Sequence, residues 1–127
     1  DYLTVDYSGY EYTGGAHGYP YRSHYLFDLT TGEEKTLADL YQGSVEEFKD
    51  IVAQYSVQNW KDNPGPYFGW DSEDAAYADL YDNASLDMLM RYGTDGIQIE
   101  YSPYEFGPYA SGYIGVEIPY EALNINL

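Results

Sequence analysis

Short runs in which apolar and polar residues alternate constrain the fold of this chain more than any other feature of its sequence. Alternation with a period of two predicts a strand with one buried face, as in the run of Leu3, Val5 and Tyr7. The predicted strands cover residues 3–8, 21–29, 85–92, 96–102 and 113–120. Because hairpin signals such as Asp95-Gly96 join strands here, rather than long crossovers, we predict an α+β fold with a mostly antiparallel sheet of about five strands.

One amphipathic helix separates the two groups of predicted strands. Ser44 and Glu47 have the Ser-x-x-Glu spacing of a capping box, which marks the start of a helix. Apolar residues then recur at spacings of three and four, at Phe48, Ile51, Val52 and Tyr55. The prolines and the glycine of residues 62–66 end this helix. The predicted helices are the main one at 44–61, which packs on the sheet, and short turns at 37–41 and 73–81.

The chain is strongly acidic, with 22 Asp and Glu residues against 5 Lys and Arg, and its formal net charge is −17. Binding to nucleic-acid phosphates or to an anionic membrane surface needs a basic footprint, so both classes of function are excluded. Long-range attraction favours a cationic partner instead. The other interpretation of this charge is solubility alone.

The 127 residues are enough for one domain with its own hydrophobic core, and no linker or internal repeat divides residues 1–127. Cys is absent, which excludes disulfides and thiolate metal sites. No apolar run reaches the roughly 18 residues of a membrane helix. Because the chain begins at Asp1 rather than Met, we expect a leader, an anchor or a whole upstream segment to have been removed, and contact with a membrane only through that segment.

The residue types that carry catalysis are sparse or poorly placed. His17 and His24 are the only imidazoles, so a zinc site would need carboxylates as its other ligands. The chain has no Gly-x-Ser-x-Gly elbow, and the glycines of residues 12–18 are not followed by the lysine of a phosphate-binding loop. Acidic pairs are too common here to specify a glycosidase, and residues 71–82 lack the glycine and the glutamate of an EF-hand. We predict a protein that is not an enzyme, with no metal and no cofactor.

Residues 102–112, SPYEFGPYASG, concentrate aromatic residues, prolines and glycines around one carboxylate. Pro103 and Pro108 restrict the backbone, so we predict a stiff corner between two strands. Such a corner would hold Tyr104 and Tyr109 in place, either to cap the sheet or to contact a partner with little loss of entropy. We interpret Glu105 as a structural acid rather than a catalytic one. An enzymatic alternative would need a second carboxylate or His17 within reach of it.

Three blocks of the sequence resemble the DUF3298 domain, the extracytoplasmic C-terminal part of RsiV-type anti-sigma factors of Gram-positive bacteria. They are YTGGAHG at 12–18, YLFDLTTGEEKTLADLY at 25–41, and DGIQIEYSPYEFGPYASGYIGVEIPYEAL at 95–123. The resemblance implies an α+β domain outside the cell, and it implies that the residues matching the family's signature either bind a ligand or hold the fold. These residues are Gly14, Gly15, Ala16, His17, Pro103, Tyr104, Glu105, Pro108 and Tyr109.

The resemblance also implies a receptor that recognises lysozyme, a strongly basic protein, and the acidic composition is compatible with such a partner. We therefore expect a non-enzymatic sensing or binding module in the cell envelope, membrane-anchored or at the cell surface. The alternative is a wall-associated domain that binds peptidoglycan, with Tyr104 and Tyr109 as sugar-stacking platforms. Residues 63–82 match the family least, so we expect partner choice to lie there.

Overall fold

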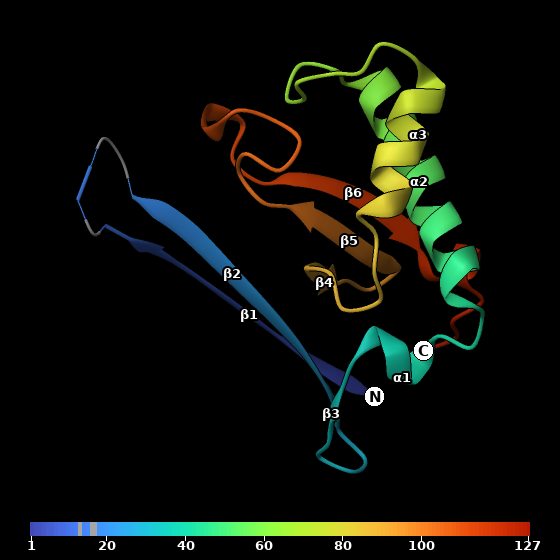
Figure 1. Cartoon of the computed structure of the whole chain (residues 1–127). Helices are drawn as coiled ribbons and strands as arrows, with labels where there is room; N and C mark the ends of the chain where they lie inside the picture. Colours follow the sequence, from blue (N-terminus) through green and yellow to red (C-terminus); the bar gives the residue numbers. More distant parts are fainter. Residues whose placement is uncertain (13, 16–17) are drawn as a thin grey trace.

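The structure is a computed structural model that describes residues 1–12, 14–15 and 18–127, and these form two three-stranded antiparallel sheets (Figure 1). The first sheet is a long ribbon of two ten-residue strands, extended at its base by a short third strand: β1 (Tyr2–Glu11), β2 (Tyr19–Asp28) and β3 (Glu34–Lys35). The second sheet has the order β4 (Met90–Tyr92), β5 (Gly96–Tyr101) and β6 (Ile114–Pro119). The α+β class and the antiparallel pairing predicted from the sequence are confirmed.

The helices of the described chain are α1 (Leu37–Leu40), α2 (Val45–Asp62) and α3 (Glu73–Asp82), with 3₁₀ turns η1 (Tyr109–Ser111) and η2 (Tyr120–Leu123). The main helix is confirmed with its cap, because the Ser44 hydroxyl oxygen accepts the Glu47 N–H at 3.1 Å. The helical turns predicted around 37–41 and 73–81 are also present. None of the helices formed by the described residues combines the length and the apolar character needed to cross a membrane.

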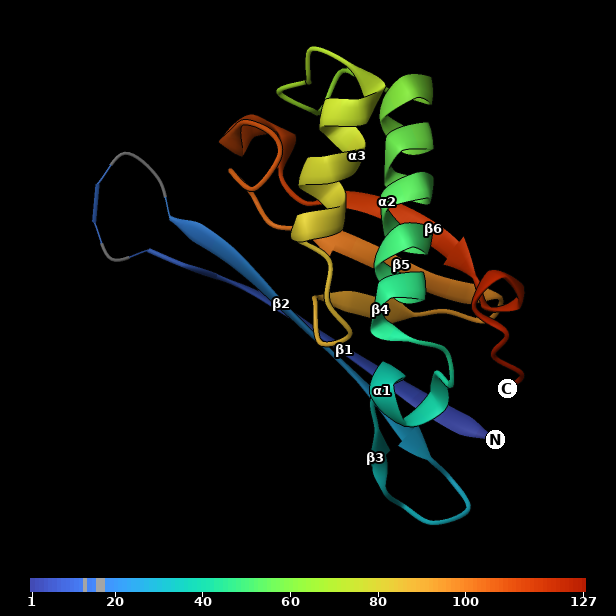
Figure 2. The same ribbon diagram turned by 45° about the vertical axis from the view of Figure 1, so that its right-hand side comes forward.

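The core lies between the helices and one face of the β4–β5–β6 sheet, as Figure 2 shows for α2 and α3. Ile97, Ile99 and Tyr101 alternate along β5 and are all buried. The Tyr101 hydroxyl lies 2.8 Å from the hydroxyl of Ser56 on α2, which satisfies both buried groups. Since alternate residues of a strand point to opposite faces, Gln98 and Glu100 point away from this core, towards the ribbon.

The prediction of one five-stranded sheet is wrong, because the ribbon and the β4–β5–β6 sheet are separate. Pro20 has no N–H to donate, so β2 cannot form a continuous ladder along the edge that faces the second sheet. Side chains satisfy that edge instead. The Tyr109 hydroxyl donates to the Gly18 carbonyl at 2.8 Å, and the Tyr113 hydroxyl donates to the Pro20 carbonyl at 3.2 Å.

The strand predicted at 85–92 is also too long, since only Met90–Tyr92 pairs with β5. The preceding residues turn after α3, where the Ser85 hydroxyl donates to Asp87 at 2.7 Å and the Met88 N–H donates to the Ser85 carbonyl at 3.3 Å. Leu86 and Met88 alternate as they would in a strand, but they pack on the core from a loop.

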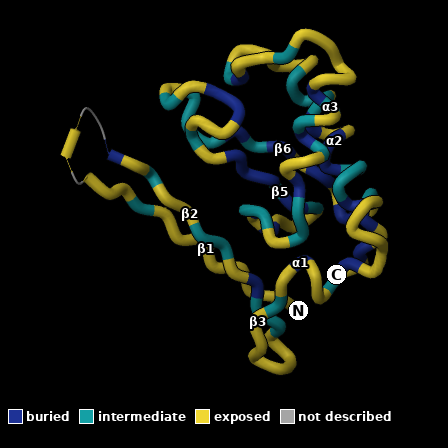
Figure 3. The backbone as a smooth tube through the Cα atoms, in the orientation of Figure 1, coloured by how far each residue is buried: buried dark blue, intermediate teal, exposed yellow. Residues whose placement is uncertain are grey.

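The prediction of one buried face on the first strand is wrong in a way that bears on function. Leu3, Val5 and Tyr7 are 49%, 41% and 56% exposed, and Figure 3 shows most of the ribbon as exposed backbone. The alternate residues of β2 that include Leu26 point towards the body, and Leu26 is 1% exposed. The side of the ribbon that carries Leu3, Val5 and Tyr7 therefore faces solvent.

Candidate binding surface

Residues 102–112 form a tight turn between β5 and β6 that is fixed by its own hydrogen bonds. The Tyr104 N–H donates to the Gly107 carbonyl at 3.1 Å, and the Glu105 N–H donates to the Ser102 carbonyl at 3.0 Å. Tyr104 has a φ of 73°, in the left-handed region that residues other than glycine rarely adopt. Pro108 follows with a φ of −68° and leads into η1. We call residues 102–112 the corner.

A buried aromatic residue anchors the corner to the body. Phe106 is 6% exposed, and its ring meets the Tyr101 ring edge-on, with centroids 4.8 Å apart. The Phe106 ring also lies 5.7 Å from the Trp70 ring. A Cβ atom on Gly107 would lie 2.1 Å from the Pro66 carbonyl oxygen, so this approach requires glycine. The corner is therefore held against the loop that precedes α3.

The outward side of the corner contacts the tip of the ribbon. Tyr109 donates its hydroxyl proton to the Gly18 carbonyl at 2.8 Å, while the Gly18 N–H donates to the Tyr10 hydroxyl at 2.7 Å. The Tyr19 and Tyr109 rings meet edge-on at 6.4 Å, and the Tyr104 ring lies 5.8 Å from the Tyr109 ring. We call these four side chains the tyrosine cluster: Tyr10, Tyr19, Tyr104 and Tyr109.

The tyrosine cluster is exposed but ordered by its own hydrogen bonds. Tyr10, Tyr19 and Tyr104 are 60%, 56% and 48% exposed. A hydrogen bond with Tyr10 raises the pKa of Tyr109 to about 12, so the Tyr109 hydroxyl keeps its proton at neutral pH. The result is a polar-tipped aromatic surface whose rings are restrained before any ligand arrives.

The predicted signature residues occupy two neighbouring places. Gly14 and Gly15 are exposed in the loop beyond β1, with φ of +110° and +97°, which glycine adopts without strain. Gly18 closes that loop, and a Cβ atom there would lie 2.4 Å from the Glu11 carbonyl oxygen. Ala16 and His17 lie outside the described residues, as does any role predicted for His17.

The other signature residues, Pro103, Tyr104, Glu105, Pro108 and Tyr109, all lie in the corner. Glu105 is exposed, and its Oε1 accepts the Ser102 N–H at 3.0 Å across the turn. This hydrogen bond gives Glu105 a contact within its own turn. The structure thus brings Tyr104 and Tyr109 together with the end of the glycine loop at Gly18.

An ion-pair cluster between the ribbon and β5 was not predicted from the sequence. Glu100 is 4% exposed, and one of its oxygens lies 2.5 Å from Arg22 Nη1. Its other oxygen bonds to Nε2 of His24, whose Nδ1 lies 2.7 Å from Asp6 Oδ1. The Arg22 guanidinium also stacks over the Tyr113 ring at 4.3 Å.

One signal in the sequence could have revealed this cluster. Arg22 and His24 are two positions apart on a predicted strand, so they share one face, and basic residues are rare in this chain. In a protein with so many carboxylates, two basic side chains on one face of a strand indicate an acidic partner packed against that face. Nothing in the sequence distinguished Glu100 from the other carboxylates as that partner.

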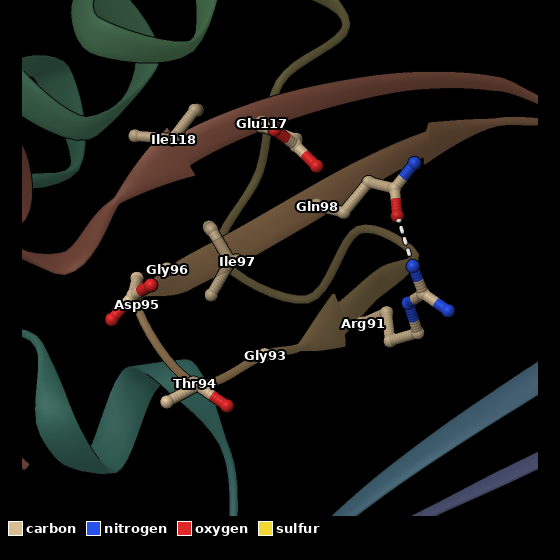
Figure 4. A pocket seen from close by; sticks show the side chains of 9 residues that line it. All are labelled: Arg91, Gly93, Thr94, Asp95, Gly96, Ile97, Gln98, Glu117 and Ile118. Carbon is tan, nitrogen blue, oxygen red and sulfur yellow. Dashed lines mark hydrogen bonds between the residues drawn. The ribbon is translucent and has the colours of Figure 1, made fainter.

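Shallow cavities lie elsewhere on the described surface. One, of 300 Å³, sits at the β4–β5 hairpin, where Arg91 Nη2 donates to Gln98 Oε1 at 2.7 Å (Figure 4). Another, of 440 Å³, lies beside β2 and is lined by Arg22, His24 and several apolar side chains. Neither of these two cavities contains Glu105 or a member of the tyrosine cluster.

Two solved structures resemble this one. A DUF3298 family protein from Bacteroides fragilis has a TM-score of 0.69 and 23% sequence identity, covering 97% of this chain and 47% of that one. A DUF3298 family protein from Pseudomonas aeruginosa has a TM-score of 0.64 and 20% identity, covering 97% of this chain and 54% of that one. No protein-family model and no curated protein matches the sequence.

These likenesses show that the chain has the fold of DUF3298 family proteins, as the resemblance in its sequence implied. The chain spans about half of the length of the two solved structures. Both of those proteins come from Gram-negative bacteria, so the expected Gram-positive origin gains no support from them.

Proposed function

We propose that this domain is a non-enzymatic binding module of the bacterial cell envelope whose partner is a cationic protein such as lysozyme. The observation that carries the proposal is the tyrosine cluster, an exposed set of restrained aromatic rings on a domain of net charge −17. Tyrosines supply large contact areas with little loss of conformational freedom, which is why they are enriched in binding surfaces.

The charge and the aromatic surface act at different stages of binding. The acidic domain attracts a basic protein over distances of about a Debye length, roughly 8 Å at physiological salt, and so raises the association rate. The aromatic side chains then determine how long the complex lasts, because desolvated aromatic anchors contribute most to slow dissociation.

The geometry of Glu105 supports a binding role over a catalytic one for the corner. Its carboxylate is exposed and accepts a backbone hydrogen bond within its own turn, so its observed contact holds the shape of the corner. The extracytoplasmic location is part of the same proposal and is supported by the resemblance of the sequence to the DUF3298 domain.

Calorimetric titration of the domain with hen egg-white lysozyme tests this function. We expect micromolar or tighter binding at about 50 mM salt, and weaker binding at about 150 mM salt because screening reduces the attraction. Tyr104→Ala should weaken binding about tenfold, since it removes an exposed ring of the cluster. The control is Tyr55→Ala on α2, where the side chain is 36% exposed and lies outside the tyrosine cluster.

If the wild-type domain gives no heat of binding at either salt concentration, the lysozyme proposal is wrong. The alternative partner is peptidoglycan, which the pair of neighbouring rings at Tyr104 and Tyr109 favours because sugar rings stack on aromatic faces. Retention of the domain on purified peptidoglycan, lost in Tyr104→Ala, would establish that alternative instead.

A further inference from the structure

The solvent-facing side of the ribbon is an aromatic and aliphatic surface whose large side chains are mostly exposed. Residues directly paired across β1 and β2 project to the same side, and the exposed phase pairs Leu3 with Phe27, Val5 with Tyr25 and Gly9 with Tyr21. We call this side the outer face, and its residues are Leu3, Val5, Tyr7, Gly9, Tyr21, Ser23, Tyr25 and Phe27. Tyr21 and Tyr25 are 40% and 39% exposed.

The outer face is pre-shaped at its centre. The Tyr21 side chain lies across Gly9, where a Cβ atom would be 2.2 Å from the Tyr21 hydroxyl oxygen. The Tyr7 ring lies 5.8 Å from the Tyr21 ring, with the planes tilted by 36°. A glycine opposite an aromatic residue lets the ring lie down on the strands, which flattens the surface and restrains the side chain.

Carboxylates mark both ends of this apolar surface. Glu11 pairs with Tyr19 at the tip, and Glu34 of β3 pairs with Phe27 at the base, so both acids share the side of the outer face. Both are exposed, and no Lys or Arg occupies a paired position between them on that side. The order along the ribbon is therefore acid, apolar surface, acid.

This order selects among possible occupants. A second copy of the chain would bring another net charge of −17 and its own Glu11 and Glu34, so like charges would meet at the edges. A basic protein with an apolar patch between Lys or Arg side chains meets both requirements. Tyr19, which belongs to the tyrosine cluster, lies on the same side of β2 and makes the two surfaces continuous.

We infer that the outer face of the ribbon is the main docking surface for a basic protein partner, with Glu11 and Glu34 pairing with basic side chains on either side of an apolar contact. This inference rests on the proposed function and extends it from the corner to the ribbon. A two-stranded ribbon by itself is only marginally stable in water, so burial of its outer face against a partner also stabilises the ribbon.

The test compares matched variants in the lysozyme titration. Val5→Thr with Tyr25→Thr removes apolar surface while β-branched threonine keeps the strand preference, and we expect binding at least tenfold weaker. Glu11→Gln with Glu34→Gln should weaken binding about fivefold and reduce its dependence on salt. The charge control is Glu46→Gln with Glu121→Gln, which removes the same number of negative charges from helical turns and should change binding less than twofold.

Each outcome decides a different point. Two results would overturn the docking surface and leave the proposed function standing. One is that both outer-face variants bind lysozyme as tightly as the wild type. The other is that the charge control loses as much affinity as Glu11→Gln with Glu34→Gln. A wild-type domain that does not bind overturns both. Chemical labelling of tyrosines in the wild-type complex avoids any effect of substitution on folding, and we expect lysozyme to protect Tyr7 and Tyr21 but not Tyr55. Equal protection of all three would contradict the inference.

Discussion

At the scale of single residues, one buried carboxylate determines how the ribbon is attached to the rest of the protein. Glu100 lies on the side of β5 opposite the core and is still only 4% exposed. A buried carboxylate is unfavourable unless it is paired, and both of its oxygens are paired here, with Arg22 and His24 of the ribbon.

We predict that Glu100→Gln lowers the free energy of unfolding by about 3 kcal/mol, because Arg22 and His24 lose their common partner. Hydrogen exchange should accelerate in β1 and β2 more than in α2, since the ribbon detaches first. The control Glu117→Gln, at an exposed position on β6, should change stability by less than about 0.5 kcal/mol in urea unfolding. Equal effects of the two substitutions would contradict the role given to Glu100.

The second prediction at this scale concerns the fit of the corner. Gly107→Ala places a Cβ atom 2.1 Å from the Pro66 carbonyl oxygen, so the corner must move, and we expect a loss of about 2 kcal/mol. Gly65→Ala is the matched substitution, since no atom lies within 4 Å of its added Cβ. Urea unfolding of the two variants should therefore differ, and identical midpoints would show that the corner yields without strain.

At the scale of elements, the main helix was predictable and the ribbon was only partly so. The local signals of α2 are an N-cap serine, a three-four apolar repeat and a proline-rich end, and all of them act within the helix and its immediate neighbours. The alternation in β1 correctly indicated a strand, but which side of a strand is buried depends on what packs against it. In the ribbon Leu3, Val5 and Tyr7 stay largely exposed.

A cap substitution tests the local origin of α2. Ser44→Ala removes the acceptor of the Glu47 N–H, and we expect a loss of about 1 kcal/mol in the free energy of unfolding. Ser44→Gly should cost only a few tenths of a kcal/mol, because glycine leaves the helix terminus open to water. Thermal unfolding of the two variants measures the contribution of the cap, and we expect the lower midpoint for Ser44→Ala. A lower midpoint for Ser44→Gly would show that the Ser44 hydrogen bond is not what stabilises the start of α2.

At the scale of the whole molecule, the protein combines a net charge of −17 with a core that contains several tyrosines. Burial raises the pKa of Tyr67 and of Tyr120 to about 12, and burial raises the pKa of Tyr101 as well. Their hydroxyl groups form hydrogen bonds within the protein, as when the Tyr67 hydroxyl donates to Asn59 Oδ1 at 2.6 Å.

These tyrosines predict an alkaline limit to stability. Tyrosines of the unfolded chain ionise near pH 10, so above that pH the unfolded state loses protons that the folded state retains. The stabilisation is complete below pH 10 and is lost as the pH rises towards 12, with about 1.4 kcal/mol lost per buried tyrosine by pH 11. Urea unfolding across this range measures the slope, and Tyr67→Phe should make it shallower. A midpoint that stays constant from pH 9 to pH 11 would contradict the prediction.

The sequence by itself determined the fold class, the limits of α2, the hairpin at Asp95-Gly96 and the position of the corner, because each depends on residues close together in the chain. Only the tertiary structure decided that the sheets are separate, that Glu100 joins them, and that the apolar side of the ribbon faces solvent. Those features depend on contacts between residues far apart in sequence, such as Gly18 with Tyr109. Local alternation cannot specify them, since a strand shows the same pattern whichever surface lies opposite its apolar side.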